Sequence, residues 1–138
     1  MTWGGLTRWP VFRRWFGNRS ERAAARFLKR LGYRVLARNV VLPPGELDLI
    51  ALDGRTLVFA EVRSTEGTDA ELPAASVDAA KQKKLTDVAL AFLQKKRLLN
   101  HPARFDVLAV SWPPNQREPR VVHYPNAFEA VGKFQMYR

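Results

Sequence analysis

The feature that constrains this chain most is a pair of apolar runs joined by Asp53-Gly54. Residues 46–52 (ELDLIAL) and 56–63 (TLVFAEVR) both have the length and composition of β-strands. Asp-Gly between two such runs is typical of a tight hairpin turn. We therefore expect the two runs to form an antiparallel pair of strands.

Helical and strand patterns continue on both sides of this hairpin. Ser20 and Ser76 are candidate N-caps, because a serine side chain can accept a hydrogen bond from the unpaired N–H groups of a first helical turn. The other predicted elements are helices at 21–31 and 77–98, strands at 33–41, 104–110 and 120–124, and a short last helix from Asn126. The order α-β-β-β-α-β-β-α predicts an α/β fold.

The chain is predicted to fold as one domain behind a basic, aromatic N-terminal arm. Its 138 residues match the size of a single compact domain. Residues 1–19 form the arm, which is rich in Trp, Phe and Arg, and residues 20–138 form the domain. The arm suits contact with nucleic acid or a membrane surface, or it packs on the domain, and the sequence leaves these alternatives open.

Charge is distributed unevenly along the chain, which has a net charge of +10. Residues 1–40 contain ten Lys or Arg and one acid, whereas residues 41–80 contain two Lys or Arg and eight acids. Basic flanks around an acidic island fit an enzyme that acts on phosphodiesters, with cations for the backbone and carboxylates for a metal. Chance segregation of solvated charges explains the same distribution about equally well.

Several other classes of protein lack support in the sequence. The chain has no cysteine, and its only histidines are His101 and His123, so a structural zinc site is excluded by the number of ligands. It also lacks the glycine-rich loops that bind nucleotide phosphates. The absence of cysteine and of a long apolar stretch leads us to expect a cytoplasmic protein.

Two acidic residues of the hairpin are the candidate site. Side chains alternate between the faces of a strand, so Asp48 shares a face with Glu46, and Glu61 shares one with Arg63. Glu61 interrupts the apolar run LVFAEV, where burial of an unpaired carboxylate is costly. If the hairpin aligns Asp48 with Glu61, the pair offers hard oxygen ligands to Mg²⁺ or Mn²⁺. The alternative is a plain ion pair between Glu61 and Arg63.

Five sequence blocks occur in a distinctive order over about residues 20–129. They are SERAAARFLKRLGYRVLARN, GELDLIA, VFAEVR, KQKKL and RFDVLAV. Together they resemble the YraN-like family, also called uncharacterised protein family 0102. That family is similar to the restriction-endonuclease-like PD-(D/E)xK superfamily, which includes archaeal Holliday-junction resolvases. The resemblance implies a three-layer fold, in which helices flank a central mixed sheet of about five strands.

The resemblance also implies a metal-dependent nuclease site. By position, Glu21, Asp48 and Glu61 are the acidic residues around a divalent metal, which Asp48 and Glu61 bind directly. Arg63 occupies the position of the motif's lysine, and Lys81 matches a basic position on the second helix. Arginine keeps its proton near neutral pH, so Arg63 is expected to stabilise phosphate charge and not to act as a base.

Three functions are compatible with these features. The first is metal-dependent hydrolysis of nucleic acid, with DNA favoured and branched DNA included. The second is a non-catalytic module that binds nucleic acid through basic residues: Arg22, Arg26, Lys29, Arg30, Lys83 and Lys84. The third is a membrane- or protein-associated module that uses the N-terminal arm. Analogy with resolvases adds a homodimer, because a four-way junction has two-fold symmetry.

Overall fold

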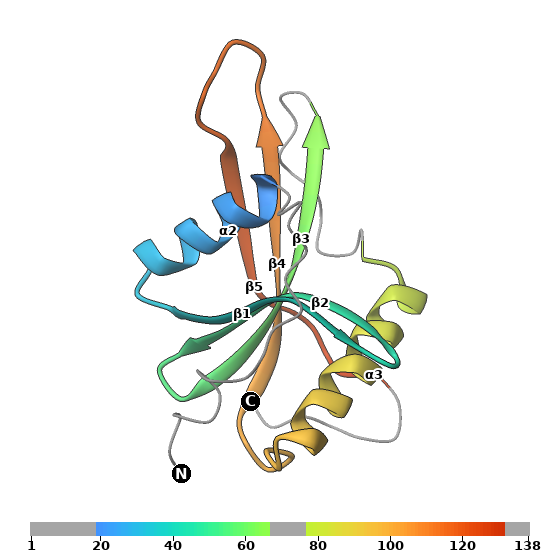
Figure 1. Ribbon diagram of the computed structural model, residues 1–138. Helices are drawn as coiled ribbons and strands as arrows, with labels where there is room; N and C mark the ends of the chain where they lie inside the picture. Colours follow the sequence, from blue (N-terminus) through green and yellow to red (C-terminus); the bar gives the residue numbers. More distant parts are fainter. Residues whose placement is uncertain (1–18, 67–76, 132–138) are drawn as a thin grey trace.

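A computed structural model describes residues 19–66 and 77–131, which form a five-stranded sheet with one helix on each face (Figure 1). The elements are α2 (Arg19–Arg30), β1 (Arg34–Leu42), β2 (Gly45–Asp53), β3 (Thr56–Glu66), α3 (Ala79–Lys95), β4 (Ala103–Trp112) and β5 (Arg120–Phe128). This three-layer α/β arrangement confirms the expected fold class. The predicted N-terminal arm lies outside the described residues, except for Arg19, which begins α2.

The sheet is mixed, and its strand order β1-β2-β3-β4-β5 follows the chain. Strands β3 and β4 are parallel and are connected through α3, whereas the other neighbouring strands are antiparallel. The predicted hairpin forms between β2 and β3, and the pair Asp53 and Thr56 closes it. Gly54 begins the turn at a φ of 58°, a conformation that glycine adopts without steric penalty.

Helix α2 covers one face of the sheet with small side chains. Ala23, Ala24, Ala25 and Leu28 are buried in a cluster with residues of β2, β3 and β4. Alanine lets the helix backbone approach the strands closely, and Gly32, at a φ of 93°, ends the helical segment. The predicted first helix is therefore present, and small side chains make up most of its buried face.

Ser20 has a different role from the predicted N-cap. It lies inside α2, which begins at Arg19, and its hydroxyl donates to Ser64 Oγ at 2.8 Å. The same hydroxyl accepts a hydrogen bond from Trp112 Nε1 at 2.8 Å. Ser20 therefore connects the start of α2 to the ends of β3 and β4.

Helix α3 covers the opposite face, where Leu85, Val88 and Phe92 are buried. Its N-cap is Asp78, whose side chain accepts from Lys81 N at 2.8 Å, and the predicted cap Ser76 lies outside the described residues. The helix ends at Lys95, three residues earlier than expected. The reason is a left-handed turn at Arg97, with a φ of 58°, which directs the chain away from the helix axis.

The short last helix predicted from Asn126 does not form there, because residues 126–128 belong to β5. The strand has an irregularity opposite Asp106, where Asn126 adopts a φ of 51°. Asp106 Oδ1 accepts the backbone N–H of Asn126 at 2.9 Å, and Phe128 stacks on Phe105 with ring centroids 4.7 Å apart. These contacts are with β4, which lies far away in the sequence. They stabilise a strand at residues 126–128 instead of the predicted helix.

The described ranges contain two helices, α2 and α3. Neither is both long enough and apolar enough to cross a membrane.

Candidate active site

The register of the β2–β3 hairpin brings Asp48 and Glu61 together. Leu49 pairs with Ala60, so Asp48 and Glu61 occupy the next position along the two strands. Glu61 follows Phe59 at the two-residue spacing of a strand and therefore faces α3, since Phe59 belongs to the cluster beneath that helix. The two carboxyl groups are close enough to shift each other's pKa.

The strands separate at this point, and a side chain replaces the main chain in the hydrogen-bond ladder. Pairing of β2 with β3 ends at Leu49 and Ala60, and Asp48 Oδ2 accepts the backbone N–H of Val62 at 2.9 Å. Glu61 is buried, with its side chain 10% exposed. The gap between the strands therefore contains two carboxyl groups that are largely removed from water.

Burial and mutual repulsion make this pair difficult to ionise completely. Burial, together with the neighbouring charge of Asp48, raises the pKa of Glu61 from 4.5 to about 7, although Lys81 and Arg63 oppose the rise. Burial also raises the pKa of Asp48, against the hydrogen bond from Val62. The pair therefore still holds part of a proton near neutral pH, and it lacks positive charge.

The cation that approaches Glu61 is Lys81. Lys81 Nζ lies 3.9 Å from Glu61 Oε1, and its side chain is 42% exposed. Asp78 fixes the start of α3 by accepting the backbone N–H of Lys81, which directs this helical turn to the carboxyl pair. Arg63 acts on Glu61 through its charge, without an ion pair within 4 Å in the described part of the chain. The cation in contact with Glu61 is therefore Lys81, and not Arg63 as the ion-pair alternative proposed.

Glu21 and Glu46 occupy different positions relative to the pair. Glu21 lies on α2, in the layer on the other face of the sheet from α3. Glu46 is near enough for its charge to raise the pKa of Asp48. Within residues 19–66 and 77–131, no three His, Asp or Glu side chains converge in a way that could hold a metal ion. The structure therefore brings together two of the three implied acids, Asp48 and Glu61.

The two-carboxylate set fits a hard divalent cation. Mg²⁺ usually binds proteins through one or two carboxylates and keeps its other positions for water and substrate phosphates. The raised pKa of Glu61 shows that Lys81 does not fully balance the two acids. Asp48 and Glu61 are therefore the residues that would hold Mg²⁺ or Mn²⁺.

The six basic residues predicted to contact nucleic acid are exposed, but they do not form one surface. Arg22, Arg26, Lys29 and Arg30 lie on α2, whereas Lys83 and Lys84 lie on α3, in the opposite layer. Lys83 Nζ also donates to Asp87 Oδ1 at 2.7 Å, which reduces the charge it offers to a ligand. The α2 residues and the α3 residues must therefore act separately.

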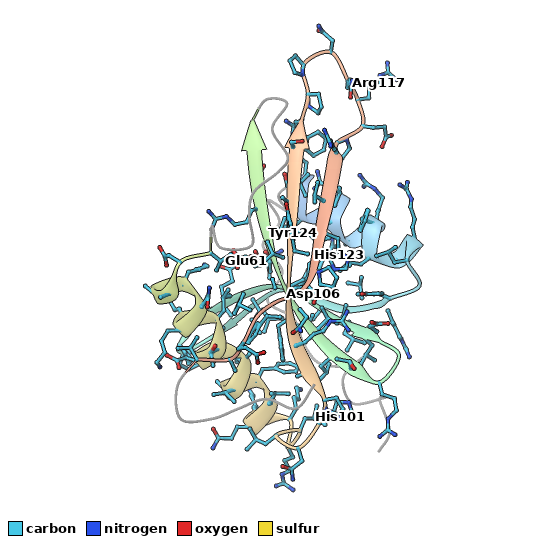
Figure 2. All side chains as sticks on the ribbon, turned by 180° about the vertical axis from the view of Figure 1, so that it is seen from behind. Glu61, His101, Asp106, Arg117, His123 and Tyr124 are labelled. Atoms are coloured by element: carbon cyan, nitrogen blue, oxygen red, sulfur yellow. The ribbon has the colours of Figure 1, made fainter. Side chains whose placement is uncertain are left out.

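Asp106, on β4, is a second buried acid. It accepts from Arg104 Nε at 2.9 Å and lies 2.8 Å from His123 Nε2, in addition to its bond from the backbone of Asn126. Burial alone would raise the pKa of Asp106, but these hydrogen bonds outweigh it and lower the pKa. Figure 2 shows Asp106 beside His123, apart from Glu61.

Both histidines are structural. His101 is buried, and its Nε2 lies 2.6 Å from the carbonyl oxygen of Arg55, which connects the start of β4 to the β2–β3 turn. His123 contacts Asp106, and the rings of Phe27 and Tyr33 lie edge-on against it at 5.9 and 5.8 Å. The sequence gave no signal for these contacts, because their partners are far away along the chain.

The sheet, its two helical layers and the carboxyl pair define this chain as a three-layer α/β protein with a restriction-endonuclease-like fold. The sequence profile of Uncharacterised protein family UPF0102 matches residues 20–110, a range that contains Asp48, Glu61 and Lys81. The chain belongs to the UPF0102 family.

Relatives from distant bacteria are similar over most of the chain. A UPF0102 protein of Rhodopirellula baltica is 45% identical over 124 residues, which cover 88% of this chain and 74% of the relative. One from Geobacter sulfurreducens is 42% identical over 113 residues, covering 82% and 88% of the two chains. One from Symbiobacterium thermophilum is 44% identical over 114 residues, covering 83% and 96%. The similarity therefore extends over nearly the whole fold.

Proposed function

We propose that this protein hydrolyses phosphodiester bonds of nucleic acid with a divalent cation held by Asp48 and Glu61. The observation that carries the proposal is the carboxyl pair between β2 and β3, in which burial and the charge of Asp48 raise the pKa of Glu61 to about 7. Strongly perturbed acids in contact with one another are typical of functional sites. A structural role alone would be better served by complete neutralisation, as at Asp106.

The residues around the pair have separate roles in this proposal. Asp48 is oriented by the N–H of Val62, and Glu61 is oriented by its strand. Lys81, partly exposed beside Glu61, is placed to contact phosphate oxygens and balance the charge that develops during hydrolysis. Arg63 adds a positive charge that is not lost near neutral pH. A bound divalent cation would polarise the phosphodiester and acidify water.

Cation binding is expected to displace the proton from Glu61. Because the pKa of Glu61 is about 7 without a metal, a cation competes with that proton below neutral pH. Affinity for Mg²⁺ or Mn²⁺ should therefore rise with pH through this range. Isothermal titration calorimetry at several pH values measures this directly, and affinity that does not vary with pH would contradict it.

The decisive experiment compares wild type with Asp48→Asn and Glu61→Gln on labelled linear, flapped and four-way-junction DNA and RNA. Asp87→Asn is the matched control, since it removes an exposed acid of α3 that is paired with Lys83. We expect metal-dependent cleavage that falls by about 100-fold or more in both site variants and is unchanged in the control. Absence of cleavage by wild type, or equal cleavage by all proteins, would overturn the proposal.

A second candidate function, a non-catalytic nucleic-acid-binding module, is favoured by the exposed basic residues of α2. Arg22, Arg26, Lys29 and Arg30 all lie at the surface of one helix. Neutralisation of phosphates by such residues gives affinity that decreases steeply with salt. Salt-dependent binding by wild type, without cleavage at any metal concentration, would select this function over hydrolysis.

A further inference from the structure

A hollow of about 210 Å³ lies between α2 and the chain that leads into β5. Arg26, Phe27 and Arg30 line it from the helix, and Glu118 and Val121 line it from the opposite side. Figure 1 shows the β4–β5 connection extending beyond the sheet on the side where α2 begins. We refer to this hollow as the α2–β5 groove. It lies on the face of the sheet opposite the carboxyl pair, because α2 and α3 cover different faces.

Several contacts hold the walls of the α2–β5 groove in place. The start of α2 is attached to the end of β4 by the hydrogen bond from Trp112 to Ser20, and the Arg19 guanidinium lies 3.9 Å from the centre of the Trp112 ring. On the floor, the Phe27 ring contacts His123, which is itself held by Asp106. The groove is therefore built before any ligand arrives, which lowers the entropic cost of binding.

The groove has a basic rim. Arg22, Arg26 and Arg30 follow one another at four-residue spacing, so they lie along one side of α2 about 6 Å apart along the helix axis. Arg117 is exposed in the β4–β5 connection, next to Glu118 in the chain. Figure 2 shows Arg117 at the outer end of this connection. Guanidinium groups bind phosphates through paired hydrogen bonds, so a line of arginines suits a chain of phosphates.

We propose that the α2–β5 groove binds the phosphodiester backbone of a nucleic-acid strand without a metal, as a site separate from Asp48 and Glu61. This inference rests on nucleic acid being the substrate in the proposed function, and it adds a second point of attachment. Glu118 is the one acid among the residues that line the groove. It faces the same space as Arg26 and Arg30 and therefore weakens the binding of phosphate.

The test measures binding of the full-length chain to a labelled linear DNA duplex in EDTA by fluorescence anisotropy, as a function of salt. The variant is Arg26→Ala with Arg30→Ala, which keeps good helix formers on the surface of α2. The matched control is Arg55→Ala with Lys95→Ala, which removes the same charge from exposed positions on the β2–β3 turn and at the end of α3. Thermal unfolding of both confirms that they are folded.

We expect the groove variant to lose about tenfold or more in affinity and its salt slope to fall by about two, whereas the control loses much less. Glu118→Gln should increase the affinity for the duplex by about threefold or more, because it removes a charge that repels phosphate. Equal losses in the groove variant and the control would show that net charge alone matters and would overturn the proposal. Unchanged affinity in the groove variant would also overturn it.

The same variants separate this site from the proposed hydrolysis and from another partner. The loss of affinity caused by Arg26→Ala with Arg30→Ala should be the same in EDTA with and without Asp48→Asn, because the two sites lie on different faces. If wild type binds DNA through the groove but never cleaves it, the proposed hydrolysis is wrong and the proposed binding site is still supported. If the groove variant loses binding to phosphatidylserine vesicles but not to DNA, the groove serves a membrane surface and the proposal is wrong.

Discussion

Glu61 and Asp106 are buried acids on opposite faces of the same sheet, and their surroundings have opposite effects. Asp106 is fully buried and contacts Arg104 and His123 at hydrogen-bonding distance, so its pKa is lowered. Burial and the neighbouring carboxyl group of Asp48 raise the pKa of Glu61 to about 7, and Lys81, at 3.9 Å, opposes the rise without cancelling it. Burial is common to both, and the supply of positive charge and donors is what differs.

This comparison shows which buried acid is suited to bind a ligand. Asp106 has the donors it needs and joins β4 to β5, so its role is to stabilise the fold. Glu61 and Asp48 remain short of positive charge, and an added cation would complete them. Buried charges are costly when uncompensated, so such a site persists in a folded protein at the expense of stability.

The largest effect should follow from Asp106→Asn. This change removes the charge that neutralises Arg104. It also puts an N–H donor where one carboxylate oxygen now accepts hydrogen bonds. Together these losses should lower the free energy of unfolding by roughly 3–5 kcal/mol. Glu61→Gln, on the other face, should instead increase stability at neutral pH, because it removes a buried charge that lacks a close counterion. Urea denaturation of both variants measures the difference, and equal destabilisation would remove the distinction between the two acids.

The second effect is a pH dependence that comes from Glu61. Between pH 4.5 and about 7, folded Glu61 keeps a proton that the unfolded chain has released, so stability falls as pH rises through this interval. The fall, measured in EDTA as wild type minus Glu61→Gln, should be on the order of 3 kcal/mol. Asp106 acts in the opposite direction and at lower pH, since its lowered pKa costs stability below 3.8. A pH-independent difference between wild type and Glu61→Gln would contradict this prediction.

The smallest effect separates two lysines of α3. Lys81→Met should raise the pKa of Glu61 further, by less than about one pH unit, because the lysine is partly exposed and its charge is screened. Lys83→Met removes an exposed pair with Asp87 and should cost about 0.5 kcal/mol or less. It should leave the titration of Glu61 unchanged. Carbon-detected NMR titration of the Glu61 carboxyl group distinguishes the two, and equal shifts would show that Lys81 has no special position.

The hairpin and the alignment of its acids follow from local sequence patterns. Two-residue alternation and a tight Asp-Gly turn are local properties, and together they set the register that places Asp48 opposite Glu61. Local sequence patterns also predicted the helix that carries Lys81. These parts of the candidate site were predictable because each depends on residues close together in the chain.

Tertiary structure decided the features that depend on contacts between distant segments. The parallel pairing of β3 with β4 and the capture of Asn126 by Asp106 join residues many positions apart, and the second of these makes a strand where local spacing predicted a helix. The placement of Glu21 away from the carboxyl pair follows from the face that α2 covers, which no local pattern specifies. Side-chain periodicity fixes which side of an element is apolar, but only packing fixes which layer that side meets.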